Sequence, residues 1–236
     1  MNRGKLYGVS VGPGDPELLT LKAVRVIREA DVVAVPDIGH KRQTAYGIAR
    51  EYLEGKRILD CSTPMSRDRQ AVLTSYRAIA DKICELLDAG EDVAYLTLGD
   101  ATVYSTYMYV HDLVLERGYE AQIIPGVTSF CAAAARLGRA LCEGSEQLHV
   151  VPVIGADLDA VLDLPGSKVF MKAGRELGVL RDALAERGQL EQASLVANCG
   201  LPDERVHPRF ADADPAADYF SVVVVKESKG DADATA

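Results

Sequence analysis

The 236-residue sequence lacks several features that would narrow its function at once. No apolar run is long enough to cross a bilayer, and the residues before Leu6 lack the apolar core of a signal peptide, so we expect a cytoplasmic protein. Five scattered cysteines without a C-x-x-C pair disfavour a disulfide framework and a structural zinc site. The four histidines lie far apart, so no metal site is expected. A net charge of −9 disfavours nucleic acid and anionic membranes as partners.

Two common phosphate-binding templates are also missing. The stretch "LYGVSVGPGDPELLTLKA", from Leu6 to Ala23, has the strand, glycine turn and helix with which many nucleotide sites begin. It lacks the G-K-[ST] of a Walker loop and the third glycine of G-x-G-x-x-G. Asp15 is placed to cap the turn that follows, and Thr20 is placed to cap the main helix. The stretch is either a tight strand–helix connection or a loop that approaches a ligand without phosphate.

The chain shows instead a regular alternation of apolar runs and amphipathic segments. The first half predicts strands over residues 5–11, 31–35, 57–61, 92–98 and 121–124, and helices over 20–30, 44–53, 69–89 and 105–117. The second half predicts strands over 148–154, 168–171, 193–198, 205–210 and 219–225, and helices over 128–137 and 176–187. The repeated β-α units of the first half predict a largely parallel sheet with helices on its faces, and the chain as a whole is expected to have an α/β fold. We expect two α/β domains, residues 1–120 and 121–228, before a tail over 229–236 that frays.

Two further stretches repeat the order of strand, turn and helix start. In "YLTLGDATVYSTYMYV", residues 95–110, a buried strand ends at Leu98 and hydroxyl-bearing residues follow. In an open parallel sheet this point lies beyond the carboxyl end of a strand, where ligands bind; the alternative is a capped turn in which Asp100 bonds its own backbone. In "IIPGVTSFCAAAARL", residues 123–137, Thr128 and Ser129 precede a helix of small residues, which a simple helix cap would also explain.

The three stretches, taken in this order, resemble the tetrapyrrole methylase family through "GVSVGPGDPELLTLKA", "YLTLGDATVYSTY" and "IPGVTSF". The resemblance spans nearly the whole chain and is closest to the branch that methylates C20 of precorrin-2 or cobalt-factor II in cobalamin (vitamin B12) synthesis. It implies an enzyme that uses S-adenosylmethionine, a homodimer, and two α/β domains with the cofactor in an interdomain cleft. The chain departs from the family's usual Gly-Asp-Pro at Gly99-Asp100-Ala101, which removes a constraint on φ.

The resemblance also implies a set of cofactor contacts that are largely made by the backbone. They are Pro13, Asp100, Val103, Tyr104, Thr128, Ser129, Met171, Asn198, Cys199, Gly200 and Ser221. A sulfonium cofactor carries no phosphate, so apolar walls, main-chain hydrogen bonds and a few polar groups would suffice. A core position is the alternative for Met171.

The implied reaction is an in-line attack of a macrocycle carbon on the sulfonium methyl. It needs alignment of the reactants and exclusion of water, and no metal is required. Asp15 is the candidate proton acceptor, because the turn that holds Gly14 and Asp15 is expected to face the macrocycle. An acidic protein must hold a substrate rich in carboxylates through local cations. The candidates are Lys41, Arg42, Arg67 and Arg69, with ordinary solvated surface charge as the alternative.

Two other functions stay open beside C20 methylation. One is a related activity, either a methylase for another ring position or a diphthine synthase. The other is a tetrapyrrole carrier without methyl transfer, which should not bind S-adenosylhomocysteine. Both metal-free precorrin-2 and its cobalt complex fit the resemblance as substrates.

Overall fold

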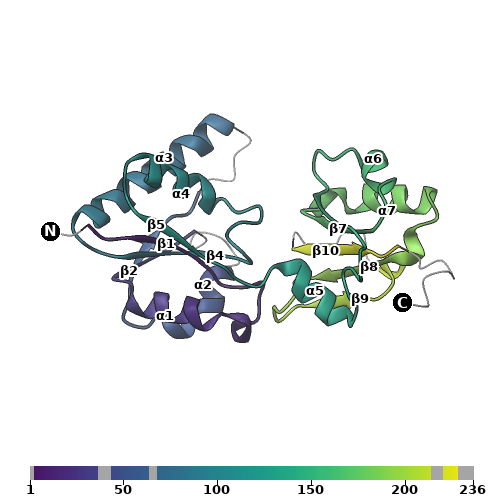
Figure 1. The fold of residues 1–236 in the computed structure, drawn as a ribbon, viewed down its shortest axis with the longest axis horizontal. Helices are drawn as coiled ribbons and strands as arrows, with labels where there is room; N and C mark the ends of the chain where they lie inside the picture. Colours follow the sequence, from purple (N-terminus) through teal and green to yellow (C-terminus); the bar gives the residue numbers. More distant parts are fainter. Residues whose placement is uncertain (1–2, 37–43, 64–67, 214–219, 228–236) are drawn as a thin grey trace. The chain divides into compact units, whose positions relative to one another are not determined.

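The computed structural model describes residues 3–36, 44–63, 68–213 and 220–227. The chain divides into two compact units, Met1–Thr128 and Ser129–Ala236, and each unit holds one five-stranded sheet with helices packed on it (Figure 1). The predicted α/β class is therefore confirmed.

The first unit contains an all-parallel sheet with the strand order β3-β2-β4-β1-β5. Its strands are β1 (Leu6–Ser10), β2 (Val32–Val35), β3 (Arg57–Asp60), β4 (Val93–Thr97) and β5 (Ala121–Ile124). Its α-helices are α1 (Leu21–Glu29), α2 (Thr44–Ala49), α3 (Arg69–Asp88) and α4 (Tyr107–Glu116), and its 3-10 turns are η1 (Pro16–Leu18) and η2 (Arg50–Tyr52). Every strand and helix predicted for this half is present, with slightly different ends.

Alternation along the strands decides which helices each side chain meets. In β1, Val9 packs with α1 and α2 on one face of the sheet, whereas Leu6 packs with α3 and α4 on the other (Figure 1). Between them, Gly8 leaves room for the ring of Tyr107 from α4, since a Cβ on Gly8 would lie 2.1 Å from Tyr107 Cε1. Helices thus cover both faces of the sheet, and the ends of its strands are left accessible.

Short polar side chains start the helices as the sequence predicts. Thr20 Oγ1 accepts a hydrogen bond of 3.1 Å from the N–H of Ala23 at the start of α1. Asp15 Oδ1 accepts one of 2.9 Å from the N–H of Glu17 at the start of η1. These caps satisfy amide groups that have no partner within the helix.

The second unit contains a mixed sheet with the order β6-β7-β10-β8-β9. Its strands are β6 (Leu148–Pro152), β7 (Ser167–Met171), β8 (Ala193–Ala197), β9 (Arg205–His207) and β10 (Ser221–Val225). Its helices are α5 (Ser129–Leu137), α6 (Leu158–Leu162) and α7 (Leu177–Glu186), with 3-10 turns η3 (Gly174–Glu176), η4 (Leu190–Gln192) and η5 (Phe210–Asp212). Among the described strands of this sheet, β6 and β7 pair in parallel, β10 runs antiparallel between β7 and β8, and β9 runs antiparallel to β8.

The structure differs from the sequence prediction at three places. The strand β5 pairs with β1, so residues 121–124 belong to the first sheet and the boundary lies after Thr128 rather than after residue 120. The helix α6 was not predicted; its five residues follow a cap by Asp157, whose Oδ1 accepts the N–H of Ala160 at 3.2 Å. The strand predicted over 205–210 ends at His207, and η5 follows.

Candidate functional site

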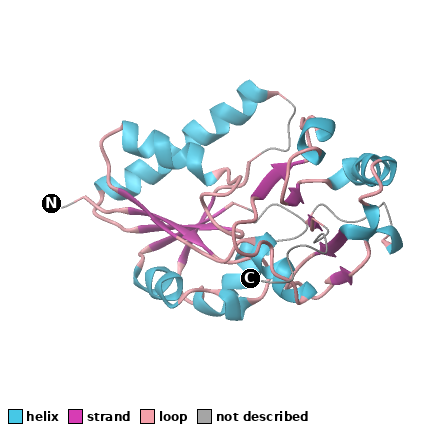
Figure 2. Cartoon of the chain, turned by 45° about the vertical axis from the view of Figure 1, so that its right-hand side comes forward, coloured by secondary structure: helices cyan, strands magenta, loops and turns pink. Residues whose placement is uncertain are grey.

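Three loops gather at one edge of the first sheet. They are residues 11–16 after β1, 98–106 after β4 and 125–128 after β5, which are the three stretches singled out in the sequence. Because β4, β1 and β5 are parallel neighbours, their carboxyl ends meet at the same edge, seen from another side in Figure 2. Gly12 and Gly99 join the first two loops, since each donates its N–H to the carbonyl of the other, at 3.2 and 2.7 Å.

Asp100 ties the second loop to the third. Its side chain is buried; Oδ1 accepts the N–H and the hydroxyl of Thr102 at 2.8 and 2.5 Å, and Oδ2 accepts the N–H of Gly126 at 2.8 Å. Burial raises the pKa of Asp100, but the hydrogen bonds from Thr102 and Gly126 outweigh it and hold the pKa below its ordinary value. The capped turn expected as an alternative is present, and the same carboxylate also reaches the loop of another strand.

Ser10, at the end of β1 where the first loop begins, is hydrogen-bonded to the second loop. Its buried Oγ accepts a hydrogen bond of 2.9 Å from the N–H of Ala101. A proline at this position would have no N–H to donate, so the departure from Gly-Asp-Pro is matched by a bond that holds the loop. Gly126 packs against the junction: a Cβ there would lie 2.5 Å from Ser10 Cβ and 2.8 Å from the carbonyl oxygen of Gly99.

The helices that follow these loops leave toward opposite faces of the sheet. After β1 the chain enters α1 on one face, and after β4 it enters α4 on the other (Figure 1). In open α/β sheets, ligands bind at the carboxyl ends of strands whose connections diverge in this way. The edge that holds the three loops is therefore the candidate binding edge of the first unit.

Two observations show that this edge is under local strain and incompletely satisfied. Tyr104, in the second loop, is 41% exposed and has a φ of 52°, a conformation that costs about 1–3 kcal/mol for a residue with a side chain. The hydroxyls of Thr97 and Thr128 are buried without a hydrogen-bond partner among the described residues. Leaving such a buried hydroxyl without a partner costs about 1–3 kcal/mol.

The predicted substrate-side residues are only partly described. Gly14 is buried in the first loop, and Asp15 is half-buried with one carboxylate oxygen in the cap of η1. Arg69 is exposed at the first residue of α3. The other three cations, Lys41, Arg42 and Arg67, lie outside the described residues.

A second group of predicted residues lies at one edge of the second sheet. The strand β7 ends at Met171, β8 ends just before Asn198, and β10 begins at Ser221. Because β10 runs opposite to β7 and β8 and lies between them, these three points share an edge. The backbone here is again unusual, since Lys172 and Asn198 both have a φ of 53°.

The predicted cofactor residues thus fall into two groups, one in each unit. The first unit gathers Pro13, Asp100, Val103, Tyr104 and Thr128, and the second gathers Met171, Asn198, Cys199, Gly200 and Ser221, with Ser129 as the first residue of α5. A cleft between the two domains stays a prediction.

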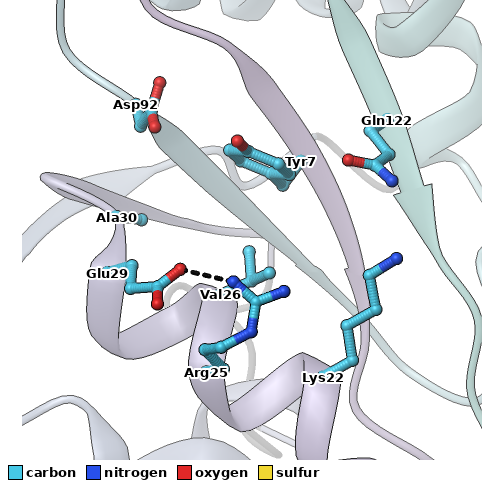
Figure 3. A pocket seen from close by; sticks show the side chains of 8 residues that line it. All are labelled: Tyr7, Lys22, Arg25, Val26, Glu29, Ala30, Asp92 and Gln122. Carbon is cyan, nitrogen blue, oxygen red and sulfur yellow. Dashed lines mark hydrogen bonds and ion pairs between the residues drawn. The ribbon is translucent and has the colours of Figure 1, made fainter.

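A hollow of about 220 Å³ lies elsewhere in the first unit (Figure 3). It is lined by Tyr7, Lys22, Arg25, Val26, Glu29, Ala30, Asp92 and Gln122. Tyr7, Asp92 and Gln122 stand at the amino ends of β1, β4 and β5, away from the three loops. Its two cations are offset by two carboxylates, and Arg25 Nη1 is paired with Glu29 Oε2 at 2.7 Å, so the hollow has no charge preference for a ligand.

The described residues hold neither a membrane-spanning helix nor a cluster of metal-ligating side chains. No helix in this part of the chain is long and apolar enough to span a membrane. No group of three or more His, Cys, Asp or Glu side chains in the same residues is arranged to hold a metal ion.

Sequence reasoning missed two polar residues that organise these edges. Ser10 ends an apolar strand, and Glu204 lies in the polar run that follows Gly200, where its Oε2 accepts the N–H of Gly200 at 2.7 Å. Neither residue breaks a periodic pattern, and both roles depend on contacts between segments far apart in the sequence or on the path of a loop.

The chain is similar to known proteins along most of its length. A family model described as Tetrapyrrole (Corrin/Porphyrin) Methylases matches residues 5–213. The probable cobalt-precorrin-2 C(20)-methyltransferase of Methanocaldococcus jannaschii is 35% identical over 95% of this chain and 97% of its own. The precorrin-2 C(20)-methyltransferase of a Sinorhizobium species is 34% identical over 94% of this chain and 95% of its own.

Solved structures share the fold over nearly the whole chain. One uroporphyrin-III C-methyltransferase structure from Thermus thermophilus has a TM-score of 0.68 and 29% identity, and covers 95% of this chain and 94% of its own. Another, solved with S-adenyl homocysteine, has the same TM-score and 23% identity, and covers 95% of this chain and 98% of its own.

Proposed function

We propose, from the premise that the chain belongs to the tetrapyrrole (corrin/porphyrin) methylase family, that it transfers a methyl group from S-adenosylmethionine to C20 of precorrin-2 or of its cobalt complex, in cobalamin synthesis. The C20 position is supported by two relatives that carry this activity in their names and match along nearly their whole length. The observation that carries the proposal is the set of hydrogen bonds that joins the three loops. The three motifs of the family resemblance form these bonds, with Asp100 at their centre.

The chemistry of the edge fits a cofactor without phosphate. The three loops contain no lysine or arginine, so their donors are neutral main-chain amides and hydroxyls. The hydroxyl of Thr128, which has no hydrogen-bond partner in the described part of the chain, would bond a polar group of the cofactor once the ligand displaces what covers it, and the half-buried Val103 would add apolar surface beside Pro13. The second unit would contribute Met171, the turn at Asn198, Cys199 and Gly200, and Ser221. When bound, S-adenosylmethionine supplies an electrophilic methyl group on a positively charged sulfur.

The protein's own contribution is then alignment, exclusion of water and removal of one proton. Loops fixed by buried hydrogen bonds hold their amides in place before the ligand arrives, so little ordering is needed on binding. The electron-rich C20 of the macrocycle is the nucleophile. Asp15 would accept the proton that C20 loses, since η1 fixes its carboxylate at the carboxyl edge of the sheet. Arg69, with Lys41, Arg42 and Arg67, would hold the substrate carboxylates.

The proposal is tested by offering metal-free precorrin-2 and its cobalt complex, each with S-adenosylmethionine, and following the macrocycle by mass spectrometry and NMR. We expect a gain of one methyl group at C20 with at least one of the two substrates. Methylation at another position would overturn the C20 assignment. Failure to bind S-adenosylhomocysteine would overturn methyl transfer and favour a carrier.

The family resemblance also supports a homodimer and a cytoplasmic location. Light scattering coupled to size-exclusion chromatography tests the first, with twice the chain mass of 25.4 kDa as the expected result. Cell fractionation tests the second, and recovery of the chain in the membrane fraction would contradict it.

A further inference from the structure

The turn that follows β8 is organised by its own polar side chains. Asn198 has a φ of 53°, and its carbonyl accepts the N–H of Leu201 at 2.9 Å. Its Nδ2 donates to Asp203 Oδ2 at 3.1 Å. The N–H of Glu204 in turn donates to the carbonyl of Leu201 at 3.0 Å. Residues 198–204 therefore form a compact turn, and the amide of Gly200 lies inside it.

Glu204 uses both carboxylate oxygens to hold this turn. Its side chain is 14% exposed; Oε2 accepts the N–H of Gly200 at 2.7 Å, and Oε1 accepts Nε of Arg136 at 2.7 Å. Burial raises the pKa of Glu204, but hydrogen bonds from Gly200, Arg136 and the thiol of Cys199 outweigh it and keep the pKa below its ordinary value. Three donors from two segments thus converge on one carboxylate.

Arg136 connects the turn to α5. It lies in the last turn of this helix, which begins at Ser129 and packs against β8 and β10. A shift of the Gly200 amide would strain its hydrogen bond to Glu204 and, through Glu204, the contact with Arg136 on the helix. The turn at Gly200 and α5, which begins at the predicted cofactor residue Ser129, are therefore linked through the side chains of Glu204 and Arg136.

We propose that Glu204 is a positioning residue for the cofactor, acting through Gly200 and Arg136 to fix the turn against α5. This inference rests on the proposed function, because the role of the turn is cofactor binding. Ordinary surface ion pairs in the same unit lack this geometry. The pair between Arg209 and Glu191, for example, joins side chains that are 58% and 68% exposed.

The main test is Glu204→Gln, with S-adenosylhomocysteine binding measured by calorimetry. The glutamine has the same shape but only one acceptor oxygen, so it can serve either Gly200 or Arg136 and not both. We expect binding to weaken roughly tenfold, the effect of losing one charge-assisted hydrogen bond. Glu191→Gln is the matched control, since it removes one exposed carboxylate of an ion pair in the same unit and should leave the affinity unchanged.

A double-mutant cycle separates positioning from general stability. Arg136→Ala should weaken binding by about threefold, and Arg136→Ala with Glu204→Gln should bind no more weakly than Glu204→Gln alone, because both changes break one linkage. Arg136→Lys keeps a donor for Oε1 and should recover part of the affinity. In the methyl-transfer assay, the KM for S-adenosylmethionine should rise in parallel while the KM for the tetrapyrrole stays constant.

The outcomes distinguish this inference from the function on which it rests. If wild type binds S-adenosylhomocysteine and Glu204→Gln binds equally well, the positioning role is wrong and the methyltransferase assignment stands. The positioning role is also wrong if Glu204→Gln lowers only the unfolding temperature, measured alongside, or if the two substitutions add independently. If wild type itself shows no binding, the methyltransferase assignment fails first.

Discussion

Asp100 in the first unit and Glu204 in the second have comparable places in their own folds but different partners. Each is a carboxylate with little exposure and a lowered pKa, and each accepts the N–H of a glycine in a loop at the end of a strand. The donors that Asp100 has among the described residues are neutral and come from its own turn and from the loop after β5. Glu204 also accepts a hydrogen bond from a charged residue, Arg136 on α5, and the side chain of Arg136 is 59% exposed.

This difference in partners indicates that the loops around Asp100 are held more firmly than the turn held by Glu204. The loops around Asp100 are held by hydrogen bonds with little access to water, so breaking one leaves a buried group without a partner. The guanidinium of Arg136 can turn to water when its partner is lost. If the proposed function is right, the first unit would present a rigid frame to the cofactor, and the turn at Gly200 would be held by a contact that water can replace.

The largest effect is expected at Gly126. In Gly126→Ala the new Cβ would overlap Ser10 Cβ and the carbonyl oxygen of Gly99, so the loops must separate. We expect the free energy of unfolding to fall by about 3 kcal/mol. Denaturant unfolding measures it, with Gly47→Ala as the control, because nothing lies within 4 Å of that Cβ in α2 and the change should be neutral or stabilising. An equal, small effect of both substitutions would show that the loops are not closely packed.

The next effect is expected at Asp100 itself. In Asp100→Asn one oxygen can still accept from Thr102, but an amide NH₂ then faces the N–H of Gly126. We expect a loss of about 2 kcal/mol in unfolding free energy and weaker S-adenosylhomocysteine binding. Asp68→Asn is the control, since Asp68 is an exposed cap of α3 and asparagine caps equally well. Unchanged S-adenosylhomocysteine binding in Asp100→Asn would show that the hydrogen bonds of Asp100 do not contribute to the cofactor site.

A smaller effect is expected at the bond from Ala101 to Ser10. Ser10→Ala leaves the N–H of Ala101 without its acceptor and should cost about 1 kcal/mol. Ala101→Pro removes the same donor and restricts φ, so its cost should be lower in the Ser10→Ala background than in wild type. Thermal unfolding of the four proteins measures the coupling, and strictly additive costs would contradict the role given to this bond.

The smallest expected effect is a dependence of stability on pH, which is confined to the acid range. The carboxyls of Asp100 and Glu204 both have a lower pKa in the folded than in the unfolded protein. The unfolded state therefore binds more protons in acid, and the free energy of unfolding decreases as the pH is lowered. Each contribution is complete above the ordinary pKa, 3.8 for Asp100 and 4.5 for Glu204, and is lost as pH falls through the lowered folded-state pKa. Asp100→Asn and Glu204→Gln should each flatten unfolding free energy against pH in this range. A parallel curve for either variant would show that its carboxyl does not take part.

The sequence predicts the first sheet well because local patterns decide it. Each strand of that unit is a short apolar run between amphipathic helices, and the parallel order follows from repeated β-α units. The second sheet depends on β10 entering between β7 and β8, a pairing of distant segments that no local pattern encodes. The helix α6 is too short to show a helical period.

The site divides in the same way. Glycines, Asp100 and the threonines of the loops are visible in the sequence because turns at strand ends need them. Ser10 and Glu204 resemble ordinary strand and loop residues, and only their hydrogen bonds to Ala101, Gly200 and Arg136 reveal what they do.

Hydrogen exchange with and without S-adenosylhomocysteine tests the central claim, that loops of both units hold one cofactor. The account predicts slower amide exchange in peptides that cover residues 11–16, 98–106, 125–130 and 198–204, all within the same titration range. Protection confined to one unit, or centred on the hollow lined by Tyr7, Lys22 and Gln122, would contradict it.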